Sequence, residues 1–238
     1  MMKNLIKPTN TIIKLFFDAW NSTSNEDKQK RAVNDIMSVL EIEPKYPKYF
    51  DDIYSIVKRS GNDDAKIKEV FKKCGNKKED DVLYKVLILD KLYSTQIVDP
   101  ISIARGILNI KDIDNRLKIV DESLVEEIAK CGNQRHEYSF ATKYCSWSNE
   151  GYVIYDNIIG HLLLSYNKCY NFYKGDFYLD SKNKKRCSLS RYDDFLRVYR
   201  KFTRTYELDT SDGSYKKIDI FLWLYGKILN KEKESLKK

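Results

Sequence analysis

One lysine and one aspartate lie in a short segment whose other residues are mostly aromatic, apolar or small. Lys143 lies within residues 139–145, and Asp156 directly follows the apolar tetrad formed by residues 152–155. An amine and a carboxylate held together can cleave a glycosidic bond, because the amine attacks the sugar carbon while the carboxylate stabilises the positive charge that develops on the sugar. Lys143 and Asp156 are therefore the candidate catalytic pair.

Each of these two residues also has an ordinary interpretation. Asp156 is an expected N-cap, since Asp is a preferred capping residue and an apolar helix follows it. Lysines are mostly solvated, but the aromatic and small neighbours of Lys143 predict a buried setting. A nucleophilic lysine must lose its proton, and desolvation together with a nearby cation favours this loss by lowering its pKa. Arg135 and His136 are the candidates for that cation.

The hydrophobic pattern predicts a mostly helical chain that positions this pair. The chain has only 9 Gly and 4 Pro, few for a β protein rich in tight turns. No repeat or linker divides it, so we expect a single unit over residues 1–238, with one lobe from about 1–80 plus the C-terminal helices and another from 81–170. Apolar spacing and capping signals predict helices over about 12–20, 24–40, 50–58, 64–73, 80–93, 101–108, 121–130, 139–147, a stretch beginning after Asp156, 192–206 and 214–229.

Composition favours an intracellular protein with a polyanionic partner. The net charge is +8 and the pI is near 9.0, which suits nucleic acid. The five cysteines are irregularly spaced and there are two histidines, so we expect reduced thiols, no metal site and no cofactor. No apolar run is long enough for export or for a membrane span, which predicts a cytoplasmic protein without membrane contact.

Basic residues are concentrated between residues 167 and 204. Eleven basic residues face four acidic ones there, a net charge of +7 by subtraction, and aromatic residues are interleaved. Basic side chains bind phosphates and aromatic rings stack on exposed bases, so this mixture suits nucleic acid. A solvated helix face over an aromatic core is the alternative. The candidate contacts in this segment are Lys185, Arg186, Arg191, Arg197, Arg200 and Arg204.

The order of residues around the candidate pair resembles the catalytic segment of the helix-hairpin-helix DNA glycosylase superfamily, in particular its 8-oxoguanine DNA glycosylase branch. Thr142-Lys143 matches the Thr-Lys pair that supplies a Schiff-base lysine. Tyr155-Asp156 matches the turn that supplies a catalytic aspartate at the start of the next helix. Residues 92–97 are similar to the end of a helix that carries a DNA-facing turn. The resemblance runs from about residue 83 to residue 166.

This resemblance implies an all-α fold of two lobes with a central cleft. Lys143 and Asp156 should open there into one concave, basic-rimmed pocket. It implies a DNA glycosylase, with or without AP-lyase activity, that acts in base excision repair on a damaged or modified base extruded from the stack. DNA, duplex or single-stranded, is the expected partner, with further contacts from Gln96, Arg135 and His136. The candidate base-pocket residues, which core packing explains equally well, are Phe140, Trp147, Tyr152 and Tyr155.

In a second interpretation, the protein has the glycosylase-like fold but no catalytic activity. The superfamily's hairpin normally reads Leu-Pro-Gly-hydrophobic-Gly before the lysine, whereas residues 131–137 hold one glycine and no proline. Glycines let backbone N–H groups approach a phosphate closely. Their loss favours a nucleic-acid-binding or interaction protein, for instance in bacterial defence against foreign DNA, whereas the intact Lys143 and Asp156 favour an enzyme. An unrelated helical scaffold is a third interpretation, and a protein partner is open in each case.

Overall fold

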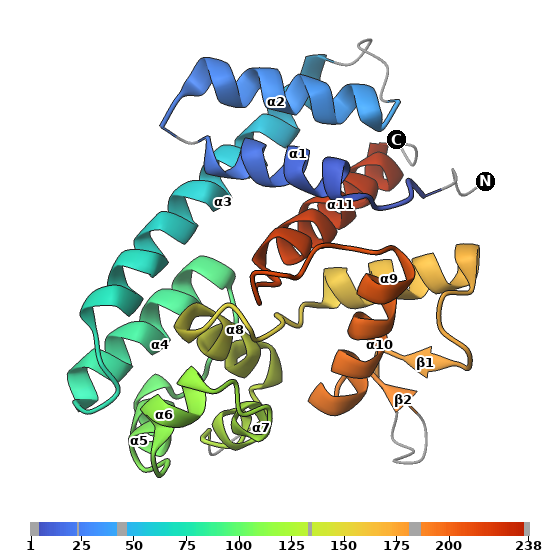
Figure 1. Ribbon diagram of the computed structural model, residues 1–238. Coiled ribbons are helices and arrows are strands. Elements are labelled where there is room, and N and C mark those ends of the chain that lie inside the picture. Colours follow the sequence, from blue (N-terminus) through green and yellow to red (C-terminus); the bar gives the residue numbers. More distant parts are fainter. Residues whose placement is uncertain (1–4, 23, 42–46, 133–134, 181–186, 236–238) are drawn as a thin grey trace.

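The computed structural model describes residues 5–22, 24–41, 47–132, 135–180 and 187–235, and over these ranges it is mostly helical (Figure 1). The all-α expectation therefore holds at this level, with one small two-stranded sheet in addition. The elements are α1 (Asn10–Asn21), α2 (Glu26–Val39), α3 (Pro47–Lys73), α4 (Glu79–Tyr93), α5 (Pro100–Leu108), α6 (Ile113–Lys118), α7 (Ser123–Ala129), α8 (Tyr138–Ser148), α9 (Asn157–Tyr170), β1 (Phe177–Tyr178), β2 (Cys187–Ser188), α10 (Tyr192–Thr205) and α11 (Lys216–Ser235).

Four helices begin at side-chain caps. Thr9 accepts a hydrogen bond from the Ile12 N–H at the start of α1, and Asn25 caps α2 in the same way. Asp99 accepts from the Ser102 N–H while Pro100 occupies the first turn of α5, as the sequence predicts. Asp156 caps α9. Capping oxygens satisfy N–H groups that have no partner within the helix, which fixes where each helix starts.

The long helix α3 corrects one expectation. The sequence predicts two short helices over 50–58 and 64–73, but a single helix runs from Pro47 through Gly61 to Lys73. Ile53, Val57 and Ile67 are all buried on one face. Burial of this apolar face outweighs the cost of about 1 kcal/mol that a glycine imposes inside a helix. Helix α6 and the β1–β2 pair were not expected either.

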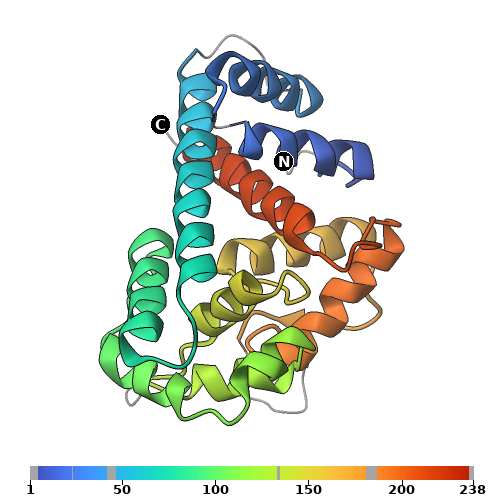
Figure 2. The same ribbon diagram turned by 60° about the vertical axis from the view of Figure 1, so that its left-hand side comes forward.

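Helix α3 connects the helices of the two chain ends with those of the middle. Near its start it packs against α1 and α2, and further along it packs against α4 and α8. Helix α11, at the C-terminal end of the chain, packs against α1 and α9. Figures 1 and 2 show α11 crossing the molecule beside α3, with α8 below it. The first and last helices of the chain therefore pack against each other.

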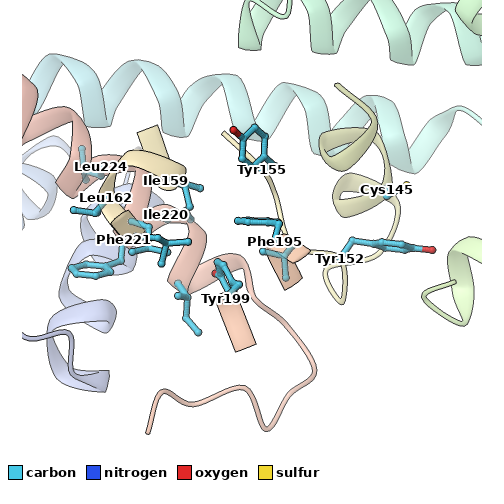
Figure 3. Close-up of a cluster of buried hydrophobic side chains, with 14 of the residues drawn as sticks. Cys145, Tyr152, Tyr155, Ile159, Leu162, Phe195, Tyr199, Ile220, Phe221 and Leu224 are labelled. Carbon is cyan, nitrogen blue, oxygen red and sulfur yellow. The ribbon is translucent and has the colours of Figure 1, made fainter. Parts of the chain in front are cut away.

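Aromatic side chains make up much of the core. Figure 3 shows part of it, including Tyr155, Phe195, Tyr199 and Phe221. Phe195 meets Tyr155 edge to face at 5.3 Å between ring centres and Tyr199 at 5.6 Å. Such pairs add about 0.5–1.5 kcal/mol each beyond the burial of their surface. Aromatic residues of α10 such as Phe195 and Tyr199 thus pack in the core of the protein.

Candidate functional site: a buried lysine and an aspartate in one pocket

Helix α8 holds Lys143 in the interior of the protein. Every residue of α8 from Phe140 to Ser146 is buried, so the helix has no solvated side over this stretch. The preceding helix, α7, packs along it. Glu137, just before α8, donates its backbone N–H to the carbonyl of Ala129 at the end of α7 at 2.8 Å. Helices α7 and α8 thus pack together around the buried lysine.

Side chains from three helices hold the extended tetrad that leads to Asp156. The Tyr155 N–H donates to Thr142 Oγ1 of α8 at 3.1 Å. The Ile154 N–H donates to Asp219 Oδ2 of α11 at 3.3 Å, and the Val153 N–H donates to the hydroxyl of Tyr192 of α10 at 3.1 Å. These hydrogen bonds satisfy buried backbone N–H groups that are not paired with a β-strand. They also fix where Asp156 lies relative to α8.

The Lys143 amine lies close to the Asp156 carboxylate. Lys143 Nζ is 3.9 Å from Asp156 Oδ2, and the two side chains are 2% and 24% exposed. The amine also donates to the backbone carbonyl of Ser139 at 3.3 Å, to the Ser139 hydroxyl, and to the carbonyl of Tyr155 at 3.5 Å. Burial lowers the pKa of Lys143, and the charge of Asp156 opposes this shift. The desolvated amine is thereby moved toward the neutral, nucleophilic form.

Asp156 combines two roles that the sequence suggests separately. Its Oδ1 accepts a hydrogen bond from the Ile158 N–H at 2.7 Å and so caps α9. Its Oδ2 is the oxygen near Lys143. The positive end of the α9 dipole stabilises the negative charge of the carboxylate. The cap therefore fixes the position of the carboxylate beside the amine.

Lys143 and Asp156 line one pocket of about 600 Å³, its open mouth included. Aliphatic side chains and three aromatic ones, Trp20, Tyr93 and Trp223, form much of its wall. These aromatic residues come from α1, α4 and α11, far from the candidate pair in the sequence. Trp20 and Trp223 meet edge to face, with ring centres 5.6 Å apart. The mixture of apolar walls with a few polar groups is typical of a small-molecule site.

The polar lining of this pocket is more acidic than basic, which corrects the expected basic rim. Asp63, Asp64, Asp156 and Asp219 line it, against Lys143 and Lys216. The expected basic rim is what the family resemblance implies. The structure places carboxylates of α3 and α11 at the pocket instead.

Asp64 anchors a second ion pair in the pocket. It accepts from Trp20 Nε1 at 3.0 Å and from the Tyr93 hydroxyl at 3.2 Å. Lys216 Nζ lies 2.9 Å from Asp64 Oδ2, with both side chains about 15% exposed or less. The same amine lies 4.1 Å from the centre of the Trp147 ring, a cation–π contact. The sequence analysis missed this cluster because its members come from α1, α3, α4, α8 and α11.

Asp219 is the most deeply buried acid of the pocket. It is 4% exposed and accepts from the Tyr199 hydroxyl at 2.6 Å in addition to the Ile154 N–H. Burial raises the pKa of Asp219 to about 7, although these two hydrogen bonds oppose the shift. Its charge therefore changes near neutral pH.

Three of the predicted base-pocket residues do not line the pocket that holds Lys143 and Asp156. Phe140, Tyr152 and Tyr155 are buried in the core, and none of them is among the pocket-lining residues. The Tyr152 hydroxyl donates to the carbonyls of Arg116 and Asp121 instead, at 3.2 and 3.1 Å. Figure 3 draws Tyr152 and Tyr155 within the hydrophobic cluster. Core packing, the alternative interpretation, explains these three residues.

Trp147 lies behind the pocket wall. Its Nε1 donates to the Tyr93 hydroxyl at 3.1 Å, and the Lys216 amine lies over its ring. It does not line the pocket itself. It supports Tyr93 and Lys216, which line the pocket.

Arg135 and His136 do not supply a cation to Lys143, which corrects that expectation. The Arg135 side chain binds the Glu137 carboxylate and the backbone carbonyls of Thr95 and Gln96. His136 Nε2 lies 2.9 Å from Glu126 Oε2. The second amine in the pocket is that of Lys216.

Gln96, a predicted DNA contact, is exposed and adopts a left-handed backbone with φ of 57°. Its backbone carbonyl accepts a hydrogen bond from Arg135.

The predicted basic contacts of α10 and its start lie apart from the pocket lining. Arg191 and Arg197 both pair with the buried Asp194, and Arg200 pairs with Glu122. Arg204 is exposed. Lys185 and Arg186 lie outside the described residues. Three of the predicted contact arginines are therefore already in ion pairs.

The geometry thus defines a mostly helical protein with a lysine–aspartate pair in a semi-enclosed pocket. Residues 44–152 match a family described as HI_0787_N, N-terminal domain. An uncharacterized protein of Haemophilus influenzae is 37% identical over 150 residues, which cover 61% of this chain and 66% of the relative. The chain therefore spans just under two thirds of that relative. No solved structure matches the chain.

The described residues contain no cluster of three or more His, Cys, Asp and Glu side chains arranged to hold a metal ion. Among the same residues, no helix is both long and apolar enough to span a membrane.

Proposed function

We propose that this protein is a DNA glycosylase with lyase activity that removes a damaged or modified base. The observation that carries the proposal is the 3.9 Å approach of a buried Lys143 amine to the Asp156 carboxylate inside one pocket. The order Thr142-Lys143 and Tyr155-Asp156 resembles the glycosylase superfamily's catalytic segment. The proposal makes α7 and α8 the counterparts of the helices that flank the superfamily's hairpin, and it makes the pocket a part of its cleft.

The proposed reaction uses both side chains of the pair. The neutral amine of Lys143 attacks C1′ of the sugar, and the electrons of the C1′–N bond leave with the base. The nitrogen of Lys143 then carries an extra proton, which passes to Asp156. That proton returns to the ring oxygen as the sugar opens, leaving an imine between Lys143 and C1′. Asp156 also stabilises the positive charge on the sugar in the transition state, where a carboxylate has its largest effect.

Borohydride trapping tests this proposal directly, because it reduces the imine to a permanent protein–DNA crosslink. We expect crosslinks on duplexes that carry an abasic site or a damaged purine, oxidised or alkylated. Peptide mapping should place the crosslink at Lys143. Lys143→Ala should abolish it, since no amine remains at that position, whereas Lys85→Met, which removes a buried lysine outside the pocket, should leave it unchanged. Crosslinking that persists in Lys143→Ala, or maps to Lys216, would overturn the assignment of the nucleophile.

The second candidate is a nucleic-acid-binding protein without catalysis, for instance in bacterial defence. Two observations favour it: residues 131–137 hold a single glycine, and the Lys143 amine is already bonded to Ser139 and Tyr155. If every abasic and damaged substrate is bound but neither trapped nor cut, this candidate replaces the first. Binding by the parent, Lys143→Ala and Asp156→Asn would then be equal.

A further inference from the structure

The outer face of α3 carries a row of basic side chains. Among the exposed side chains of residues 59–73, five are basic and one is acidic, a net charge of +4 by subtraction. These side chains, which we call the α3 row, are Arg59, Lys66, Lys68, Lys72, Lys73 and the acidic Glu69. Because an α-helix rises 1.5 Å per residue, the row extends over about 21 Å. Figure 1 shows α3 along the left-hand edge of the molecule.

The α3 row and the pocket lie on opposite sides of this helix. The residues of α3 that line the pocket are Ser60, Asp63, Asp64 and Ile67. Their spacing of three and four residues places them on one helix face. At 3.6 residues per turn, the exposed residues of the row fall on the other face. A ligand bound along the row therefore leaves the pocket free.

Three cations of the row have no ionic partner. Lys73 pairs with Glu69, and Arg59 lies 3.9 Å from Asp63. The described part of the chain places no carboxylate in an ion pair with the other three lysines of the row. The negative end of the helix dipole favours Lys72 and Lys73, which lie in the last turn, but it does not reach the lysines at 66 and 68.

An exposed aromatic ring lies beside the row. Tyr84 of α4 is 54% exposed, and α4 packs against α3. The pKa of Lys73 is raised chiefly by its hydrogen bond to Glu69, and the Tyr84 hydroxyl adds to this shift, which places Tyr84 near the end of the row. Sites that bind single strands combine basic side chains along the backbone with aromatic rings on which bases stack.

Other polyanionic partners fit this surface less well. The exposed residues of α3 between 59 and 73 include no large apolar side chain, whereas a helix that lies on a membrane inserts such side chains into it. Lysine is depleted at protein–protein interfaces, but it is a common phosphate ligand. The chemistry of the row therefore favours a nucleic-acid backbone.

We propose that the α3 row, together with Tyr84, binds single-stranded nucleic acid. The lysines contact successive phosphates, and the ring of Tyr84 stacks on one base. Such binding tolerates any sequence, because every base has a flat face. The proposal does not rest on glycosylase activity, since neither Lys143 nor Asp156 takes part in it.

A triple variant of the row tests the phosphate contacts. It combines Lys66→Gln, Lys68→Gln and Lys72→Gln, which remove charge but keep residues of similar helix propensity. Fluorescence anisotropy of an undamaged, labelled oligothymidine strand measures binding at several salt concentrations. We expect at least tenfold weaker binding at low salt, and a slope of log affinity against log salt that is shallower by about 2, because each contact with a single strand contributes about 0.7.

A matched triple variant controls for net charge. It combines Lys14→Gln, Lys28→Gln and Lys118→Gln, which remove three exposed lysines of α1, α2 and α6. This variant should keep the slope of the parent. Equal losses in both triple variants would overturn the proposal, because they would show that overall charge and not the row attracts the strand.

Tyr84 tests the preference for single strands. Tyr84→Ala should weaken oligothymidine binding about fivefold or more, the lower end of the loss for one stacked base. Binding of an undamaged duplex should not change, because its bases are already stacked on one another. Tyr84→Phe keeps the ring and should bind as the parent does. An equal effect of Tyr84→Ala on both forms of DNA, or none on either, would overturn the assignment to single strands.

The outcomes separate this inference from the proposed function. Undetectable binding of oligothymidine at low salt, or unchanged binding by the triple variant of the row, would overturn the inference even if the parent is trapped on damaged DNA. Binding of phosphatidylserine vesicles without binding of oligothymidine would overturn it as well. Conversely, Lys143→Ala should bind oligothymidine as the parent does, so the row stands even if no substrate is trapped.

Discussion

Two buried lysines of this protein lie in similar surroundings but differ in what their amines meet. Lys143 and Lys85 are each 2% exposed, and burial lowers the pKa of both. Lys85 Nζ donates to Asn76 Oδ1 at 2.9 Å and lies 5.1 and 5.6 Å from the ring centres of Phe71 and Tyr144. Lys143 instead faces a carboxylate and lines the pocket.

The difference shows that burial and a shifted pKa do not define a catalytic lysine. The Lys85 cluster is closed by its own hydrogen bonds, because Asn76 Oδ1 also accepts from Tyr144 and Asn76 Nδ2 donates to Asp114 at 2.7 Å. No residue of this cluster is among the pocket-lining residues. A nucleophile needs access for a substrate and a group that stabilises the charge formed. Lys143 has both features, and the predictions below test each part of the contrast.

Removing the carboxylate partner of Lys143 should have the largest effect. We expect Asp156→Asn to slow base release about 10²–10³-fold, the usual loss when a group that stabilises the transition state is removed. DNA affinity should stay nearly unchanged, because the carboxylate acts when charge develops. Asn is also a good N-cap, so α9 should remain intact. Single-turnover kinetics and binding titrations measure both quantities.

Asp99→Asn is the matched control for that variant. Asp99 also caps a helix, α5, but does not line the pocket. Its replacement should leave base release at the parent rate. If both variants slow the reaction equally, the effect of Asp156→Asn does not come from the carboxylate charge beside Lys143.

Asp219 should make the free energy of unfolding of the protein depend on pH. Its pKa is about 7 in the folded protein, above the value of about 3.9 in an unfolded chain. The folded state therefore holds more protons between these values, and the free energy of unfolding decreases as pH rises through this window. The decrease should be roughly 3 kcal/mol between pH 5 and pH 8.

Asp219→Asn should remove this decrease. The amide oxygen can accept from the Ile154 N–H, and the Tyr199 hydroxyl can rotate to accept from the amide nitrogen. Urea unfolding at pH 5, 6, 7 and 8 compares the variant with the parent. An identical pH dependence of both proteins would mean that Asp219 does not hold its proton at neutral pH.

Lys85 should give the opposite pH dependence. Burial lowers its pKa to about 8, below the unfolded value of about 10.4. The folded state holds fewer protons between these values, so the free energy of unfolding increases as pH rises, by roughly 2 kcal/mol between pH 7 and 10. Lys85→Met keeps a long apolar side chain against Phe71 and Tyr144 and should abolish this increase.

The difference between Lys85→Met and the parent isolates this effect from the tyrosines that titrate in the same range. Urea unfolding at pH 7, 8.5 and 10 is the measurement. If Lys85→Met loses stability equally at all three values, the amine contributes through packing and its hydrogen bond rather than through its charge.

The sequence predicts the local part of this site and misses the distant part. Lys143 and Asp156 lie on consecutive elements joined by a short extended segment, and the cap at Asp156 can be read from the residue type and the apolar helix after it. Trp20 and Trp223 come from helices near the two ends of the chain, and no local pattern indicates that they line the same pocket as Lys143. The sequence therefore predicts pocket walls from the aromatic residues nearest to Lys143, whereas Phe140, Tyr152 and Tyr155 lie in the core.

A substitution on the surface of α10 should have the smallest effect, and it should change DNA binding alone. Arg197 and Arg200 are neutralised by Asp194 and Glu122, so Arg204, which is exposed, is the clearest test of a phosphate contact on this helix. Arg204→Ala should weaken DNA binding about equally for all sequences and make the slope of log affinity against log salt shallower by about 1. Trapping at saturating DNA should remain at the parent rate, since α10 supplies no residue to the pocket lining. Arg31→Ala, an exposed arginine of α2, is the control and should leave the slope unchanged. An unchanged slope in Arg204→Ala would place the DNA contact elsewhere and leave the basic residues of α10 with a structural role.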